Sequence, residues 1–386
     1  MKVVIAIDSL KGSLSSLSAG QAAAEGIHRV YPEAECRIFP VADGGEGTVE
    51  ALAGGLGGTL RTVTVTGPLG ASVEATYAIL DGGVAVMEMS AAAGITLIPA
   101  EARDPMKTTT YGVGEMIRDA IDQGCRSFLM GIGGSATNDG GIGMLQALGF
   151  AIKDKEGKDV PLGAVGVRDA TRIGVENVLP ALKSCTFRIA CDVTNPLCGE
   201  RGCSAVYGPQ KGAKAADVPV MDGWLSAYAD LARGVFPHAD KNAPGAGAAG
   251  GIGFAFLAFL RGELKSGIDL ILDEIGIEAA MTDADVVLTG EGRLDAQTVM
   301  GKAPHGVAKR AKKHGKPVLG ISGCVTEDAR RINEGGIDAF FPIVKGACTL
   351  EEAMDVTNAY RNMADTAEQM FRLIRVFKNN GSLTVF

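Results

Sequence analysis

The segment GIGGSATNDGG, residues 131–141, combines glycine with side chains that can bind an anion. Glycine lets backbone atoms approach a ligand closely, and free N–H groups where a helix begins attract phosphate. Ser135, Thr137, Asn138 and Asp139 add hydroxyl, amide and carboxylate groups to the same short loop. This chemical variety predicts a loop that holds an anionic ligand rather than an ordinary turn.

Similar polar loops follow other predicted strands, at residues 8–13, 42–47, 192–195 and 290–295. A single Gly-Asp turn is more often structural than functional. Loops at the carboxyl ends of parallel strands, however, meet at one crevice in an open α/β sheet. We therefore expect these loops and residues 131–141 to surround a common binding site.

The side chains of these loops are those that phosphoryl transfer requires, namely carboxylates that hold Mg²⁺ and cations that bind phosphate. A bridging metal ion would relieve the repulsion between the carboxylates and a polyphosphate. The carboxylates are Asp8, Asp43, Glu46, Asp139, Asp192, Glu291 and Asp295, and the cations are Lys11, Lys211 and Arg293.

The chain lacks the motifs of the common nucleotide-binding enzymes. It contains no G-x-x-x-x-G-K-[ST] loop, and neither the protein-kinase nor the G-x-S-x-G hydrolase signature. Residues 245–251, GAGAAGG, match G-x-G-x-x-G, but no predicted strand precedes them. We interpret them as a turn before an apolar helix at 252–260, and a nicotinamide-linked dehydrogenase is a minor alternative that rests on this match alone.

The elements that position the loops alternate between strand and helix at both ends of the chain. This alternation predicts a parallel sheet with helices on both faces. Capping boxes are expected at Ser18-x-x-Gln21, where the first helix begins, and at Thr349-x-x-Glu352, where a long final helix begins. The predicted strands are the apolar runs at 2–7, 36–41, 285–289, 317–322 and 339–344.

The middle of the chain follows another pattern. The runs at 62–66, 73–80 and 84–89 succeed each other without a helix, which predicts a mixed or antiparallel sheet. We predict an α/β protein in which residues 1–60 and 282–386 form a doubly wound parallel-sheet domain. Residues 61–281 are predicted to form an inserted second α/β domain, with the ligand in the cleft between the two.

Composition excludes several classes of protein. The net charge of −8 gives no general attraction for nucleic acid or for an anionic membrane. Eight cysteines without a C-x-x-C pair and four scattered histidines argue against a zinc site. No apolar run has transmembrane length, and the first residues resemble a strand rather than a signal peptide. These observations predict a cytoplasmic protein with small-molecule partners and without nucleic-acid or membrane partners.

Taken together, the loops resemble those of the glycerate kinase family, the two-domain type that is unrelated to P-loop kinases. The matching segments follow the family's order over almost the whole chain, except for residues 378–386, for which a disordered tail is expected. They are AIDSLKGSLSS (6–16), PVADGGEGT (40–48), GIGGSATNDGG (131–141), ACDVTNPLCG (190–199), GPQKGA (208–213), GAGAAGG (245–251) and LTGEGRLDAQT (288–298).

The resemblance implies ATP-dependent phosphorylation of D-glycerate with Mg²⁺, giving 2-phosphoglycerate. The alternative product is 3-phosphoglycerate. It also implies a flavodoxin-like domain built from the two ends of the chain. A non-catalytic sensor that binds a hydroxy acid is the rival from another class, although it would need neither a metal nor so many carboxylates.

Physical chemistry assigns hypothetical roles within this interpretation. The glycerate carboxylate would bind Ser9, Lys11 and Arg293, with Asn195 as a further substrate contact and Lys11 also contributing to catalysis. A carboxylate must accept the hydroxyl proton, for which Asp192 is the first candidate and Asp43 the second. The predicted nucleotide contacts are Gly133, Gly134, Ser135, Thr137, Gly140 and Gly141, and the predicted metal ligands are Asp295, Glu291 and Asp139.

Overall fold

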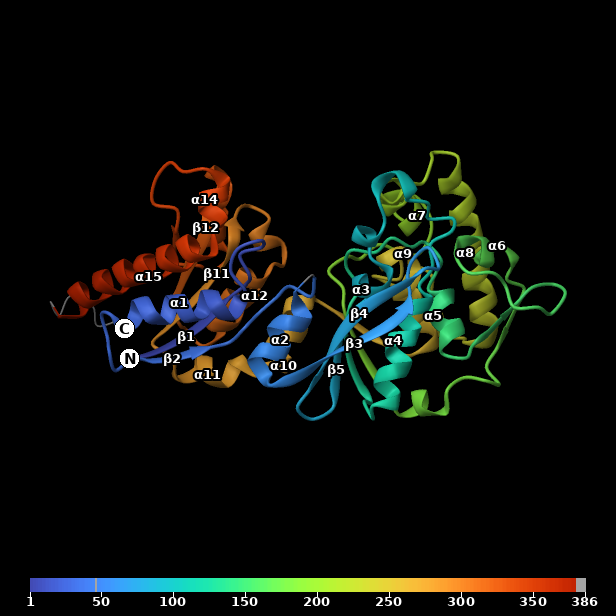
Figure 1. Ribbon diagram of the computed structural model, residues 1–386, viewed down its shortest axis with the longest axis horizontal. Coiled ribbons are helices and arrows are strands. Elements are labelled where there is room, and N and C mark those ends of the chain that lie inside the picture. Colours follow the sequence, from blue (N-terminus) through green and yellow to red (C-terminus); the bar gives the residue numbers. More distant parts are fainter. Residues whose placement is uncertain (46, 380–386) are drawn as a thin grey trace. The chain divides into compact units, whose positions relative to one another are not determined.

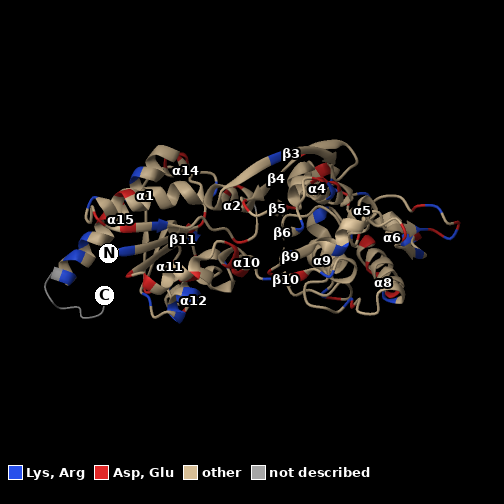
Figure 2. Ribbon diagram, turned by 90° about the horizontal axis from the view of Figure 1, so that it is seen from below, with Lys and Arg blue, Asp and Glu red and all other residues tan. Residues whose placement is uncertain are grey.

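The computed structural model describes residues 1–45 and 47–379, which divide into two compact units (Figure 1). Unit 1 contains Met1–Asp43, Glu50–Gly57 and the described chain from Ile268 onward, and unit 2 contains Gly44–Val49 and Gly58–Gly267. The predicted carboxylate of Glu46 and the predicted tail beyond residue 379 lie outside the described residues. Basic and acidic side chains are interspersed along both units (Figure 2).

A five-stranded parallel sheet forms the centre of unit 1, in the order β13-β12-β11-β1-β2. If the five strands of this unit are numbered as they occur along the chain, their order across the sheet is 2-1-3-4-5, which is the flavodoxin-like order. The prediction of a parallel sheet built from both ends of the chain is therefore confirmed. The strands are β1 Lys2–Ile7, β2 Glu35–Ile38, β11 Val286–Leu294, β12 Val318–Val325 and β13 Ala339–Pro342.

β1 and β11 are the central pair of this sheet. Val3 lies opposite Val286, and Ile7 lies opposite Gly290. β1 reads KVVIAI because helices cover both faces of the sheet, so that almost every side chain of the strand is buried. β11 is longer than predicted and continues through Leu294, since Arg293 still pairs with Cys324 of β12. Glu291 and Arg293 therefore stand on a strand rather than in a loop.

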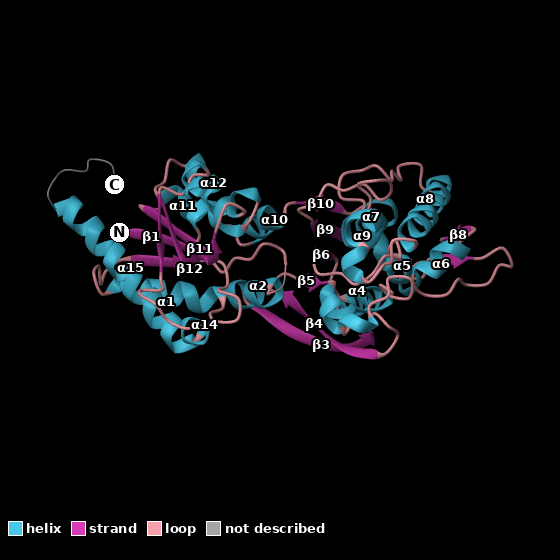
Figure 3. Ribbon diagram, turned by 90° about the horizontal axis from the view of Figure 1, so that it is seen from above, coloured by secondary structure: helices cyan, strands magenta, loops and turns pink. Residues whose placement is uncertain are grey.

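Helices cover both faces of the sheet of unit 1 (Figure 3). α1 (Ser16–His28) and α15 (Val356–Asn379) share one face, where Ala19, Ala23 and Phe371 are buried. α11 (Ile277–Asp283) and α12 (Ala303–Lys313) occupy the other face. The remaining helices with residues in unit 1 are α2 Thr48–Leu56, α10 Gly267–Glu274, α13 Arg331–Glu334 and α14 Leu350–Met354.

Residues 268–281, which the sequence placed in the inserted domain, cluster instead with unit 1. Their apolar side chains pack against α12: a Cβ added at Gly306 would lie only 2.5 Å from Ile268 Cγ1. The composition of this segment gave no sign of the change, because its apolar residues could cover either sheet.

Two predicted helix starts differ from the structure. Ser15, not Ser18, caps α1, and its hydroxyl accepts the Ser18 N–H at 3.1 Å. The predicted box at Thr349 and Glu352 forms, but it begins only the short helix α14. Asp355 interrupts the helix with extended backbone, and its carboxylate accepts the Asn358 N–H at 2.8 Å, which starts α15 anew.

Unit 2 contains a six-stranded mixed sheet in the order β10-β9-β6-β5-β4-β3. β3 (Gly58–Thr66), β4 (Ser72–Leu80) and β5 (Val84–Glu88) pair antiparallel, as the sequence predicted. β5, β6 (Ser127–Gly131), β9 (Thr186–Ala190) and β10 (Glu263–Lys265) are parallel, so their carboxyl ends share one edge. The α-helices of unit 2 are α3 Ser90–Ala93, α4 Tyr111–Asp122, α5 Ile142–Ala147, α6 Ala164–Asp169, α7 Cys203–Tyr207, α8 Asp217–Val235 and α9 Ala248–Phe259. A separate two-stranded antiparallel sheet consists of β7 (Ala151–Lys153) and β8 (Arg172–Gly174).

Among the described residues, no helix is both long and apolar enough to cross a lipid bilayer.

Candidate active site

A pocket of about 450 Å³ lies in unit 1 where β1 and β11 end. In a sheet with this strand order, the crevice between these two strands is the expected ligand site, because the connections leave it toward opposite sides. The charged and hydroxyl side chains that line the pocket are Asp8, Ser9, Lys11, Ser13, Asp43, Glu291, Arg293 and Lys302.

Asp8 is the first residue after β1, and the fold fixes it at this crevice. Its N–H donates to the Gly290 carbonyl at 2.8 Å, and its carboxylate accepts the Ser9 N–H at 2.6 Å. The residue is only 7% exposed. Burial, together with the negative charges of Asp43 and Glu291, raises the pKa of Asp8 to about 7. From the sequence, Asp8 was predicted as one of the carboxylates, without a particular role. Its position directly after a buried strand was the feature that could have indicated one.

Glu291 and Asp295 share one cation. Lys302 Nζ lies 3.3 Å from Glu291 Oε2 and 3.5 Å from Asp295 Oδ1. Thr298 also donates its hydroxyl to Glu291 Oε1 at 2.7 Å. Burial raises the pKa of Glu291 despite these contacts. Lys302 was missed by the sequence analysis, since no local pattern connects it with Glu291.

Arg293 extends toward solvent with its side chain 61% exposed, while its guanidinium holds Asp295 Oδ2 at 3.1 Å. Although burial opposes ionisation of Asp295, Lys302, the Gln297 N–H and Arg293 outweigh it and lower the pKa of this carboxyl. Lys11 is also exposed at the pocket. Two cations can therefore reach an anionic ligand here.

The pocket thus brings together five of the predicted site residues. Asp295 does not line the pocket, but its carboxylate contacts two residues that do, Arg293 and Lys302. The residues that the structure brings together are Ser9, Lys11, Asp43, Glu291 and Arg293.

The other predicted site residues belong to unit 2, where they follow β6 and β9. Gly133 and Gly134 are exposed, whereas the loop beyond them turns into the protein. Lys211 is 2% exposed, and its Nζ donates to Ser135 Oγ and to the Thr137 carbonyl, both at 2.7 Å. Burial lowers the pKa of Lys211 to about 8. The predicted loop is therefore held by a buried cation.

Asp139 is also enclosed. Its carboxylate accepts the Thr110 N–H at 2.9 Å, the Thr110 hydroxyl at 2.8 Å and the Gly141 N–H at 3.1 Å. Burial raises its pKa. With no exposed surface, Asp139 holds the loop and is not available to a metal ion, which differs from its predicted role.

The glycine-rich segment 245–251 packs against the same loop. A Cβ added at Gly250 would lie 1.9 Å from the Thr137 carbonyl oxygen, and Gly250 accepts the Gly140 N–H at 2.9 Å. Ala249 and Gly250 have positive φ, and regular helix follows them, as predicted for a turn. This packing buries Thr137, Gly140 and Gly141, so the structure does not offer them to a nucleotide. It also leaves the dehydrogenase alternative without support.

Asp192 and Asn195 follow β9. Asp192 is exposed, and its Oδ1 accepts the Gly267 N–H at 3.1 Å. Asn195 donates to the Arg201 carbonyl at 2.8 Å and accepts the Tyr207 hydroxyl at 2.7 Å. Both ends of its amide therefore stabilise the loop before α7, which leaves Asn195 a weak candidate for substrate binding.

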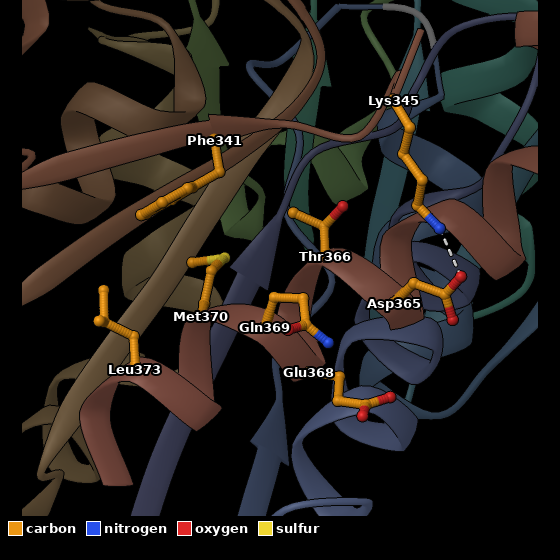
Figure 4. A pocket seen from close by; sticks show the side chains of 8 residues that line it. All are labelled: Phe341, Lys345, Asp365, Thr366, Glu368, Gln369, Met370 and Leu373. Atoms are coloured by element: carbon orange, nitrogen blue, oxygen red, sulfur yellow. Dashed lines mark hydrogen bonds and ion pairs between the residues drawn. The ribbon is translucent and has the colours of Figure 1, made fainter. Parts of the chain in front are cut away.

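A second cavity of unit 1, about 490 Å³, lies between β13 and α15 (Figure 4). Phe341, Met370 and Leu373 give it an apolar wall. Its charged side chains pair on the protein itself: Lys345 with Asp365, and Glu368 with Arg29 and Arg372. It offers no reactive group to a substrate, in contrast to the pocket between β1 and β11.

The structure is a two-unit α/β fold with a flavodoxin-like sheet and a pocket lined by charged side chains in unit 1. The family model described as the glycerate kinase family matches residues 3–375, and the chain belongs to this family.

Curated relatives and a solved structure agree with this membership. The chain is 47% identical to glycerate 2-kinase of Escherichia coli K12, over 95% of this chain and 98% of that protein. It is 45% identical to glycerate kinase of Bacillus subtilis 168, over 98% and 99% of the two chains. A crystal structure from Salmonella typhimurium LT2, provisionally described as glycerate kinase 2, matches with a TM-score of 0.91 and 43% identity, covering 98% and 99% of the two chains.

Proposed function

We propose that this protein transfers the γ-phosphoryl group of ATP to the 2-hydroxyl of D-glycerate, giving ADP and 2-phosphoglycerate. The observation that carries the proposal is the pocket of unit 1, where Lys11 and Arg293 line the same cavity as buried carboxylates. The Escherichia coli relative named glycerate 2-kinase supports the choice of substrate and hydroxyl.

Glycerate is a small anion, and the pocket has groups that can orient it. Lys11 and Arg293 would bind its carboxylate, and Ser9 would add a hydrogen bond from its hydroxyl. Arg293 is already positioned by Asp295. Such fixed cations lower the barrier by holding the acceptor hydroxyl in place.

The acceptor hydroxyl must lose its proton as the new P–O bond forms and the bond to ADP breaks. A carboxylate beside the hydroxyl would orient it and accept the proton. Asp192 is our first candidate, because it is exposed after β9 and the Gly267 N–H orients its Oδ1. Asp43, which lines the pocket of unit 1, is the second.

Mg²⁺ fits the donor set of the pocket. Asp8 and Glu291 present carboxylate oxygens, the ligands that this ion prefers, and a cation would oppose the burial and the repulsion that together raise the pKa of Asp8. Asp295 does not line the pocket and pairs with Arg293 and Lys302, so we assign it the positioning of these cations. When bound, Mg²⁺ would neutralise phosphate charge during transfer. The exposed amides of Gly133 and Gly134 are the proposed phosphate contacts in unit 2.

Incubation with ATP, Mg²⁺ and D-glycerate tests the proposal, with ³¹P NMR to identify the product. We expect ADP and 2-phosphoglycerate in equal amounts. A 3-phosphoglycerate resonance would move the reaction to the other hydroxyl. Binding of D-glycerate without any ADP formation would favour the hydroxy-acid sensor and overturn the proposal.

A further inference from the structure

The lining of the pocket of unit 1 consists of two chemically different sets of residues. One set is the charged side chains described above. The other set, called here the apolar end, comes from the segment after β13 and from α14. Its side chains are Ile343, Val344, Leu350, Ala353 and Met354.

α14 presents one apolar face to the pocket. Leu350, Ala353 and Met354 are spaced three and four residues apart, so they lie on the same side of the helix. The capping box of Thr349 and Glu352 fixes where this helix begins. A Cβ added at Gly12 would lie 2.5 Å from Met354 Cε, which shows that Met354 reaches the β1–α1 loop. Leu350 is nevertheless 76% exposed, so the core of unit 1 does not cover this face.

Glycerate alone does not explain such a pocket. It has seven non-hydrogen atoms, and at the volume per atom of liquid water it needs roughly 200 Å³, less than half of the cavity. It also has little apolar surface, because two of its three carbons carry hydroxyl groups and the third is the carboxylate. Of the proposed reactants, only the nucleobase of ATP has broad faces that apolar side chains can cover.

We propose that the apolar end of this pocket, formed by Val344, Leu350, Ala353 and Met354, binds the nucleobase of ATP. This inference rests on the proposed function, since it names the place of the co-substrate. It puts the nucleobase in unit 1, in the same pocket as the charged groups of β11 and of the loop after β1. The buried state of Thr137, Gly140 and Gly141 supports it, because only Gly133 and Gly134, the proposed phosphate contacts, are exposed in this part of the loop.

A free thiol inside the pocket gives a direct measurement. Cys324 lines the pocket and is exposed, whereas Cys348 is exposed but does not line it. Alkylation by iodoacetamide, followed by peptide mass spectrometry, reports each thiol separately. Because a bound ligand loses most of its surface to a pocket, saturating adenosine should slow the alkylation of Cys324 by about fivefold or more, with Cys348 unchanged. Equal rates at Cys324 with and without adenosine would overturn the proposal.

A pair of charge insertions tests the apolar face itself. Leu350→Asp places a carboxylate against the nucleobase, while Val356→Asp makes the same change at a neighbouring residue that is 57% exposed and does not line the pocket. We expect the adenosine Kd, measured by calorimetry, to rise about tenfold or more in Leu350→Asp and to stay unchanged in Val356→Asp. The Kd of inorganic triphosphate should stay unchanged in both.

Unchanged adenosine binding by Leu350→Asp, or equal weakening by both variants, would contradict the proposal. So would a loss of D-glycerate binding in place of adenosine binding. Neither adenosine measurement requires phosphoryl transfer. A protein that binds adenosine at this end but forms no ADP would therefore refute the proposed function and leave this inference standing.

Discussion

Lys211 Nζ donates a hydrogen bond to Ser135 Oγ over 2.7 Å, although the two residues are 76 positions apart. The same ammonium group donates to the Thr137 carbonyl, and the whole side chain is buried in unit 2. A buried cation thus supports the glycine-rich loop at residues 131–141 from inside the protein.

Replacing Lys211 by Met should destabilise unit 2, because the Ser135 hydroxyl and the Thr137 carbonyl lose their partner. We expect a loss of roughly 2–4 kcal/mol in the free energy of unfolding, measured by urea denaturation. Lys214→Met, at an exposed residue, is the control and should change it by less than about 0.5 kcal/mol. Equal stability of the two variants would contradict the role of Lys211.

The same pair of proteins has a defined pH dependence. Burial lowers the pKa of Lys211 from 10.5 to about 8. Between these values the unfolded chain binds more protons than the folded one, so the contribution of Lys211 to stability rises with pH, by roughly 3 kcal/mol in total. Below pH 8 the contribution is constant. The stability difference between wild type and Lys211→Met should therefore grow from pH 7.5 to pH 10; a flat difference would refute the assignment.

Asp8→Asn should raise stability while it lowers activity. The pKa of Asp8 is raised from 3.8 to about 7, so the folded state binds more protons between these values and loses stability as pH rises through them. Without Mg²⁺ at pH 8, the variant should gain roughly 2–4 kcal/mol over wild type, and the gain should vanish near pH 4. Thermal denaturation at both pH values checks this, and a gain that persists at pH 4 would point to another cause.

Asp192→Asn tests the proposed proton acceptor. The amide can keep the hydrogen bond from the Gly267 N–H to the side-chain oxygen, so the fold should persist. Turnover should fall by about 10²-fold or more, because the amide cannot accept the proton, while the KM for D-glycerate changes little. Asp43→Asn is the parallel variant. Near-normal turnover of folded Asp192→Asn, with loss in Asp43→Asn, would transfer the role to Asp43.

Gly250→Ala should disrupt the loop that Lys211 supports. Its φ of +69° and the 1.9 Å approach of an added Cβ to the Thr137 carbonyl leave no room for a side chain. We expect a loss of roughly 3 kcal/mol or more. Gly223→Ala, an exposed position in α8 with no atom near the added Cβ, should instead gain about 0.5–1 kcal/mol. Similar melting temperatures for the two variants would contradict this account.

The sequence predicted the strands well because β1, β6 and β9 are short apolar runs that end in polar residues. It could not predict which loop residues face a ligand. Thr137 and Gly140 look like ligand contacts until residues 245–251, more than a hundred positions away, pack over them. The predicted strand stopped at residue 289 because the residues after it are polar. In the structure β11 continues to Leu294, because its backbone pairs with β12.

The same limit applies to the charged pocket. Lys11, Glu291 and Arg293 stood out because each lies in a strand-end loop motif. Lys302 lies in no such motif, and only the turn between β11 and α12 brings its ammonium group to Glu291. Asp8 was visible in the sequence, but its raised pKa depends on Asp43 and Glu291, which the fold alone places nearby.

The pairing of β1 with β11 also constrains how the chain is made. During synthesis the KVVIAI strand leaves the ribosome roughly 280 residues before its partner, which at 5–20 residues per second is a delay of about 14–57 s between Val3 and Val286. Throughout that time the apolar strand and the apolar side of α1 lack their final neighbours. Nascent unit 1 is thus a natural client for chaperones, whereas all of unit 2 has been synthesised once Gly267 has emerged, before β11 appears.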